Sequence, residues 1–146
     1  MQEEQTMSLF SASREIAAGV DQVFAAISAP ERLARWWGPD GFSNRFETCD
    51  FRPGGRWVFT MHGPDGKHYP NENVFVEIDA PRKVVVEHVG QPKYRLTLTL
   101  TPTPAGTRVN WAQQFESAEL AERMAPIVIP ANEQNLDRLQ AEVLRS

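Results

Sequence analysis

Three side chains of this 146-residue chain have the chemistry of acid–base catalysis. His88 and Glu77 fall in phase with the apolar residues of two predicted strands, and Glu133 lies in the predicted last helix. Burial in an apolar pocket raises the pKa of a carboxyl group, so a histidine beside such a carboxyl can act as a base and an acid. A structural hydrogen bond is the favoured explanation for His88 and for Glu77 taken singly. We therefore assign no catalytic residue and keep these three as candidates.

The same predicted strands carry many large aromatic residues on one face, together with a few polar ones. Trp36 and Trp37 stand just before a Gly-Pro breaker, and we expect Trp37 to line a cavity and Trp36 to pack in the core. Such residues either fill the core or line a hollow for a small molecule. The candidate ligand-binding residues are Trp37, Trp57, Phe59, Met61, Phe75, His88, Trp111, Gln113, Phe115, Asn132 and Leu136.

Metal and cofactor sites are disfavoured by the residues available. Cys49 is the only cysteine, so neither an intramolecular disulfide nor a cysteine-based zinc site can form. The spacing of His62, His68 and His88 does not bring them together. The pair Gly54-Gly55 belongs to a turn and not to a phosphate-binding loop. We expect no metal and no cofactor.

Composition also disfavours several classes of partner. The net charge is −4, and the 15 Lys and Arg residues are scattered along the chain, which argues against a nucleic-acid partner. No apolar stretch approaches the roughly 20 residues of a membrane span. The acidic N-terminus does not resemble a secretion signal. We therefore expect a cytoplasmic protein.

The hydrophobic periodicity predicts the elements that position these residues. A strand over residues 9–17 comes first, and Asp21 and Pro30 then begin two short helices that end at Ser28 and Trp36. Alternation of apolar and polar residues predicts six strands over residues 46–51, 56–62, 74–78, 83–89, 94–101 and 107–115. After Ser117 the period is again helical, and Pro126 and Pro130 are expected to interrupt this last segment before a closing helix to Arg145.

This order predicts an α+β fold with a curved antiparallel sheet whose apolar face is covered by the last helix. We expect residues 1–8 to form a flexible N-terminal tail and residues 9–146 to form a single domain. An edge strand of such a sheet is able to pair with a second copy, so a homodimer is an open alternative.

Several motifs together resemble those of the START-like, helix-grip (SRPBCC) superfamily. They are Trp-Trp-Gly-Pro at 36–39, Asp-Phe-Arg-Pro-Gly-Gly at 50–55, Gly-Pro-Asp-Gly at 63–66 and the helical segment 131–139. Within the superfamily, the chain is similar to the branch related to the activator of the ninety-kilodalton heat-shock protein ATPase. The resemblance covers residues 9–144, and its motifs specify a family but no reaction.

The resemblance implies a β-α-α-β6-α order and a cavity between the sheet and the C-terminal helix. It also implies a small hydrophobic or aromatic ligand. Two alternatives stay open: a polyketide cyclase-like enzyme, of cyclase, dehydratase or hydrolase type, that uses the same cavity, and an interaction module of stress-response or co-chaperone systems. A chain of this length has no room for the additional N-terminal domain of the eukaryotic co-chaperone, so we do not expect a direct chaperone partner. A binding protein is favoured over an enzyme.

Overall fold

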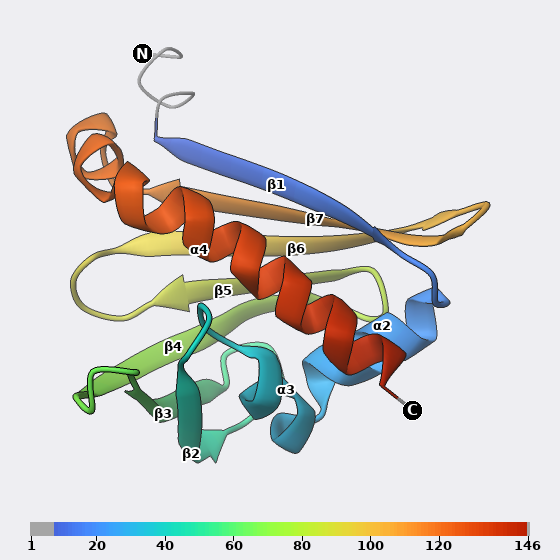
Figure 1. The fold of residues 1–146 in the computed structure, drawn as a ribbon, viewed down its shortest axis with the longest axis horizontal. Helices are drawn as coiled ribbons and strands as arrows, with labels where there is room; N and C mark the ends of the chain where they lie inside the picture. Colours follow the sequence, from blue (N-terminus) through green and yellow to red (C-terminus); the bar gives the residue numbers. More distant parts are fainter. Residues whose placement is uncertain (1–7, 146) are drawn as a thin grey trace.

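One curved antiparallel sheet of seven strands and a long helix that crosses its concave face make up the structure (Figure 1). The structure is a computed structural model, and it describes residues 8–145. The strands lie in the order β1-β7-β6-β5-β4-β3-β2, so the first strand pairs with the last. Their bounds are β1 Leu9–Ile16, β2 Ser43–Cys49, β3 Arg56–His62, β4 His68–Asp79, β5 Lys83–His88, β6 Tyr94–Thr103 and β7 Gly106–Phe115.

Between residues 8 and 145, three helices complete the fold: α2 Val20–Ser28, α3 Pro30–Trp36 and α4 Ala118–Leu144. Pro30 occupies the first turn of α3, where its missing N–H costs nothing. Ser117 caps α4 by accepting a hydrogen bond from the Leu120 N–H. The α+β fold and the element order are as predicted. None of the helices between residues 8 and 145 has the length and apolarity to cross a membrane.

The N-terminal tail was predicted over residues 1–8, and residues 1–7 lie outside the described residues. Ser8 does not fit that prediction, because it is buried and its carbonyl accepts a hydrogen bond from the Phe115 N–H. The β1–β7 pairing therefore extends to Ser8.

The predicted interruption of the last helix is wrong, because α4 runs through Pro126 and Pro130. A proline removes the hydrogen bond to the carbonyl four residues before it, which leaves the carbonyls of Glu122 and Pro126 without a helical donor. Both prolines are exposed, so these carbonyls lie on the solvent side of the helix, where water can satisfy them. The apolar face toward the sheet is unaffected.

Strand β4 begins earlier than predicted and contains a bulge. Phe75 pairs with Val86 and Glu77 pairs with Val85, so Val76 is an extra residue between two ladder positions. The bulge shifts the alternation by one residue, and Glu77 falls on the face opposite Phe75. The prediction that Glu77 shares the inner face with Phe75 is therefore wrong.

The core lies between the concave face and helices α2, α3 and α4. A buried Glu142 side chain, 6% exposed, joins α4 to α3. Its Oε2 accepts hydrogen bonds from Arg32 Nε at 2.9 Å and from Arg35 Nη1 at 3.0 Å. Burial raises the pKa of Glu142, but the Arg32 hydrogen bond, the charge of Arg145 and the Arg35 contacts outweigh it and hold the pKa below its ordinary value.

Candidate functional site

An inner cavity of about 140 Å³ lies between the concave face of the sheet and the middle of α4. Aromatic side chains supply much of its wall, and amide side chains supply most of its polar part. The lining residues are Trp37, Gly38, Pro39, Phe59, Met61, Asn71, Tyr94, Leu96, Trp111, Gln113, Ile127, Val128, Ala131, Asn132 and Asn135. No Asp, Glu, Lys, Arg or His is among them.

The two adjacent tryptophans at the end of α3 have different environments. Trp36 is 1% exposed and its indole N–H donates to the Ala26 carbonyl at 2.9 Å, so it packs between helices. Trp37 caps the C-terminus of α3 and lines the inner cavity. Its ring lies against that of Trp111, with centroids 5.8 Å apart and planes at 29°. One member of the pair is thus structural, and the other forms part of the cavity wall.

Helix α4 holds the loop that follows Trp37. The Gly38 N–H donates to Asn135 Oδ1 at 2.8 Å, and Arg138 Nη1 donates to the carbonyls of Gly38 and Pro39, each at 2.8 Å. Gly38 has a positive φ of 102°, which an L side chain rarely adopts. These contacts fix the position of Trp37 relative to α4.

Polar atoms of the inner cavity wall lack partners. Gln113 Oε1 and Trp111 Nε1 are buried without a hydrogen bond among residues 8–145. The Asn132 side chain, 5% exposed, likewise has no partner in the described part of the chain. Asn135, by contrast, also donates to the Ala131 carbonyl and is satisfied. An unpaired buried polar group costs about 1–3 kcal/mol, so Gln113 Oε1 and Trp111 Nε1 favour an additional polar molecule in the cavity.

A wider outer groove of about 850 Å³ adjoins the inner cavity. It runs between α4 and the segments around the β5–β6 connection, and its further lining includes Tyr69, His88, Val89 and Met124. Six residues line both spaces and form the boundary between them: Pro39, Met61, Asn71, Tyr94, Ile127 and Ala131. The inner cavity and the outer groove thus lie next to each other beside α4.

His88 belongs to the outer groove and not to the inner cavity. Its Nδ1 lies 2.8 Å from the Pro92 carbonyl, and its Nε2 lies 3.1 Å from Asn71 Oδ1. The ring stacks on Tyr94 at 5.1 Å with planes at 5°. Burial lowers the pKa of His88, and the hydrogen bond to the Pro92 carbonyl opposes that shift. The contacts position the ring firmly, and none of them involves a carboxylate.

The structure does not bring the three candidate acid–base residues together. Glu77 is exposed and forms an ion pair with Lys83 at 3.5 Å. Glu133 is exposed and forms an ion pair with Arg14 at 3.2 Å. Within residues 8–145, neither carboxylate contacts His88. These three residues therefore give no pair that exchanges a proton with one bound molecule.

Seven of the eleven predicted ligand-binding residues line one of the two spaces, and four line neither. Trp37, Phe59, Met61, Trp111, Gln113 and Asn132 line the inner cavity, and His88 lines the outer groove. The other four lie away from both spaces. Trp57 stacks on Phe75 at 5.5 Å in the core, Leu136 is buried in the same core, and Phe115 belongs to a second apolar cluster with Ala121 and Val128.

Sequence reasoning missed Asn71, Leu96, Val128 and Asn135 as lining residues. Asn71 was missed because the predicted strand began at residue 74, whereas β4 begins at His68. Val128 lies between the two prolines, where a broken helix was expected. Leu96 and Asn135 fall in phase with recognised inward-facing positions, and that phase is the signal that reveals them.

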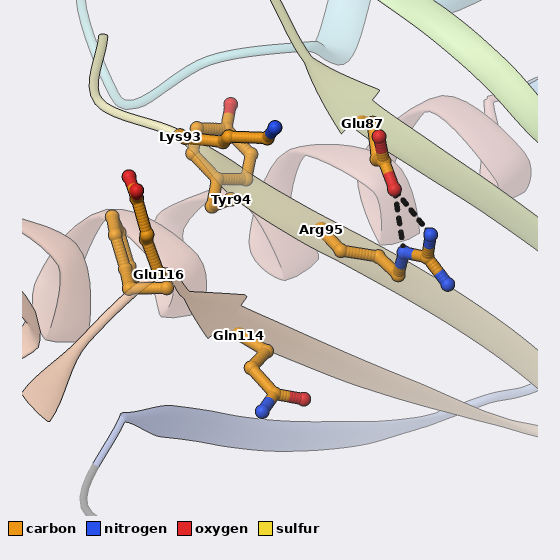
Figure 2. A pocket seen from close by; sticks show the side chains of 7 residues that line it. Glu87, Lys93, Tyr94, Arg95, Gln114 and Glu116 are labelled. Carbon is orange, nitrogen blue, oxygen red and sulfur yellow. Dashed lines mark hydrogen bonds and ion pairs between the residues drawn. The ribbon is translucent and has the colours of Figure 1, made fainter. Parts of the chain in front are cut away.

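A third space, a pocket of about 370 Å³, lies on the convex face of the sheet (Figure 2). Glu87, Arg95 and Gln114 come from three adjacent strands, and Arg95 forms an ion pair with Glu87. Arg95 is exposed and Glu87 is partly exposed, and an ion pair in contact with solvent contributes little. This pocket lacks the apolar enclosure of the inner cavity.

Metal-ligating side chains do not cluster within residues 8–145: no three of His, Cys, Asp or Glu gather in one place. His62 and His68 are paired across the β3–β4 hairpin, with ring centroids 4.4 Å apart. Cys49 is half-buried, and burial together with the charge of Asp50 raises its pKa to about 11, which keeps the thiol protonated.

Solved structures of bacterial proteins share this fold. A protein from Nitrosomonas europaea is 22% identical, with a TM-score of 0.85 over 94% of each chain. A protein from Arthrobacter aurescens is 27% identical, with a TM-score of 0.87 over 97% of this chain and 88% of the other. An AHSA1-like protein from Aeromonas hydrophila is 20% identical, with a TM-score of 0.74 over 92% and 91%.

Among curated proteins, none matches the chain at a significant level. The family model of the activator of Hsp90 ATPase homolog 1-like proteins matches residues 17–143. That segment extends from the end of β1 to the last turn of α4 and includes every residue that lines the inner cavity. The chain therefore belongs to the family of activator of Hsp90 ATPase homolog 1-like proteins.

Proposed function

We propose that this protein binds a small apolar or aromatic molecule in the inner cavity, without chemical conversion. The observation that carries the proposal is an uncharged space between the sheet and α4, walled by Trp37, Phe59 and Trp111. Enclosed aromatic walls with a few polar groups are typical of small-molecule sites. The family fold is consistent with such a role.

Binding is favoured over catalysis because His88 has no carboxylate partner in the described chain. An interaction module would need a large exposed apolar patch. The exposed Tyr69, Val89 and Ile127 instead border the outer groove, where they suit the rim of an entrance. The single free cysteine suits a reducing compartment, so we infer that the protein acts in the cytoplasm.

A titration of the protein with small neutral aromatic compounds, followed by amide NMR shifts, tests the proposal. We expect saturable shifts at residues of the inner cavity for at least one compound. Ala131→Phe places a ring where the cavity meets the outer groove and should abolish these shifts, and Ala131→Leu should weaken them. Ala141→Phe lies on an exposed position of the same helix and should leave them unchanged. The absence of saturable shifts with every compound would count against the proposal, as would normal binding to Ala131→Phe.

A further inference from the structure

The inner cavity excludes charged ligand groups by its own composition. None of the residues that line it carries a charge. A charged group moved from water into such a space loses its hydration and finds no counter-charge, which is far more costly than the same move for a neutral polar group. The part of a ligand that enters this cavity is therefore uncharged.

Two amide side chains of the inner cavity lack partners. Gln113, 8% exposed, projects from β7, and Asn132, 5% exposed, projects from α4. Within residues 8–145, no group forms a hydrogen bond with either amide, and Gln113 Oε1 is in addition fully buried. The neighbouring amides of Asn71 and Asn135 differ, because Asn71 donates to the Tyr69 carbonyl. Asn135 accepts from the Gly38 N–H and donates to the Ala131 carbonyl. Among the four amide side chains that line the inner cavity, Gln113 and Asn132 are thus the two without partners in the described residues.

The unpaired atoms define the polar group that fits beside them. Each amide offers one acceptor oxygen and one donor NH₂ group, and the indole of Trp111 adds a donor N–H. A ligand group that only accepts or only donates would leave part of this set unsatisfied. A neutral group that does both, such as a hydroxyl, satisfies donors and acceptors without a charge.

The volume limits the group further. A cavity of about 150 Å³ lined by apolar side chains is large enough for benzene, and the inner cavity of about 140 Å³ is of that size. The walls formed by Trp37, Phe59 and Trp111 suit a flat ring. A substituent that does not fit the inner cavity has to extend past the six residues that line both spaces and into the outer groove.

We infer that the ligand inserts an uncharged single aromatic ring bearing a hydroxyl group into the inner cavity, where Gln113 and Asn132 bind the hydroxyl. This inference rests on the proposed function and specifies its ligand. Gln113 and Asn132 are then specificity-determining residues. The polar group of the ligand is recognised in the inner cavity, and the outer groove contacts only the apolar remainder.

Three probes of nearly equal size test the inference: phenol, toluene and benzoate, each titrated against the protein and followed by amide NMR shifts. We expect phenol to bind about tenfold more tightly than toluene, the gain of one to two net hydrogen bonds. Benzoate should not bind at neutral pH. A cavity that is simply apolar would show the reverse order for phenol and toluene, because toluene is the less well hydrated of the two.

Gln113→Leu and Asn132→Leu remove the two amides at nearly constant volume. Each variant should weaken phenol binding about tenfold and strengthen toluene binding, which reverses the preference. Gln114→Leu is the matched control, because Gln114 is exposed on the convex face and lies outside the inner cavity. Its probe affinities should equal those of the wild type.

The outcomes separate this inference from the proposed function. If toluene binds as tightly as phenol, or if both leucine variants keep the wild-type preference, the inference is overturned while the proposed function stands. Tight binding of benzoate in the inner cavity would also overturn it. If none of the neutral probes binds, the proposed function fails and the inference fails with it.

Discussion

At the scale of single residues, neighbours in sequence have separate roles because the chain turns between them. Trp36 ends α3 and is enclosed by the core, whereas Trp37 follows the helix and faces the inner cavity. The indole N–H of Trp36 is satisfied by the Ala26 carbonyl, so a phenylalanine there leaves that buried carbonyl without its donor.

Trp36→Phe should lower the free energy of unfolding by about 1–3 kcal/mol, because it removes a buried hydrogen bond and part of a well-packed ring. Urea unfolding followed by circular dichroism measures the change. Trp37→Phe is the comparison: it should cost less stability but weaken the binding of aromatic probes. Equal losses of stability in the two variants would contradict the different roles that the structure gives them.

At the scale of elements, α4 is tied to the rest of the molecule mainly by its second half. Glu142 binds Arg32 and Arg35 of α3, and Arg138 binds the loop after Trp37. The ionised form of Glu142 is the one that accepts these hydrogen bonds, and its lowered pKa reflects that. A buried carboxylate of this kind stabilises the fold only while it keeps its charge.

Glu142→Gln should lower the free energy of unfolding by about 2 kcal/mol at pH 7, and Glu122→Gln, at an exposed position of the same helix, should change it little. The folded-state pKa lies below the unfolded value of about 4.3, so the contribution of Glu142 is complete above that pH and declines as the pH falls toward the folded-state value. Urea unfolding between pH 7 and pH 3 measures this. The difference between wild type and Glu142→Gln should shrink as acid is added, and a constant difference would refute the assignment.

Hydrophobic periodicity predicted the order of the elements and the exact bounds of α3 and β3. It failed at α4, where the helix continues through both prolines. Each proline leaves the carbonyl four residues before it without a donor, and here those carbonyls face solvent, which can hydrogen-bond them. It also failed at Val76, because a bulge adds a residue without changing the residue types around it. Both failures affected the predicted site: the candidate Glu77 lies on the outer face, and Val128, which was not predicted, lies in the cavity wall.

At the scale of the whole molecule, the site is a product of sheet curvature. Trp57 and Phe59 lie two residues apart on the same face of β3. Trp57 is nevertheless covered by core side chains, whereas Phe59 reaches the inner cavity. The sequence indicates which face of a strand a side chain lies on, but it does not give the distance between that face and α4. The cavity residues could therefore be predicted as a class, and their division between core and cavity could not.

Ligand binding to the folded protein alone should raise the stability of the entire domain. At a free phenol concentration one hundred times its dissociation constant, we expect the free energy of unfolding to rise by about 2.7 kcal/mol. Urea unfolding of the wild type with and without phenol measures the shift. Ala131→Phe should show no such increase, and an equal increase in that variant would mean that phenol stabilises the protein at some other place.

The prolines of α4 have a consequence for how fast a ligand would leave. The helix stretch that lacks hydrogen bonds at Glu122 and Pro126 also carries Met124 and Ile127, which border the outer groove. Local unfolding of such a stretch costs less free energy than unfolding of the domain, and the half of α4 after Asn132 stays attached through Arg138 and Glu142. The residence time of a molecule in the inner cavity would then follow the opening rate of these few turns, and the overall stability of the protein would have little influence on it.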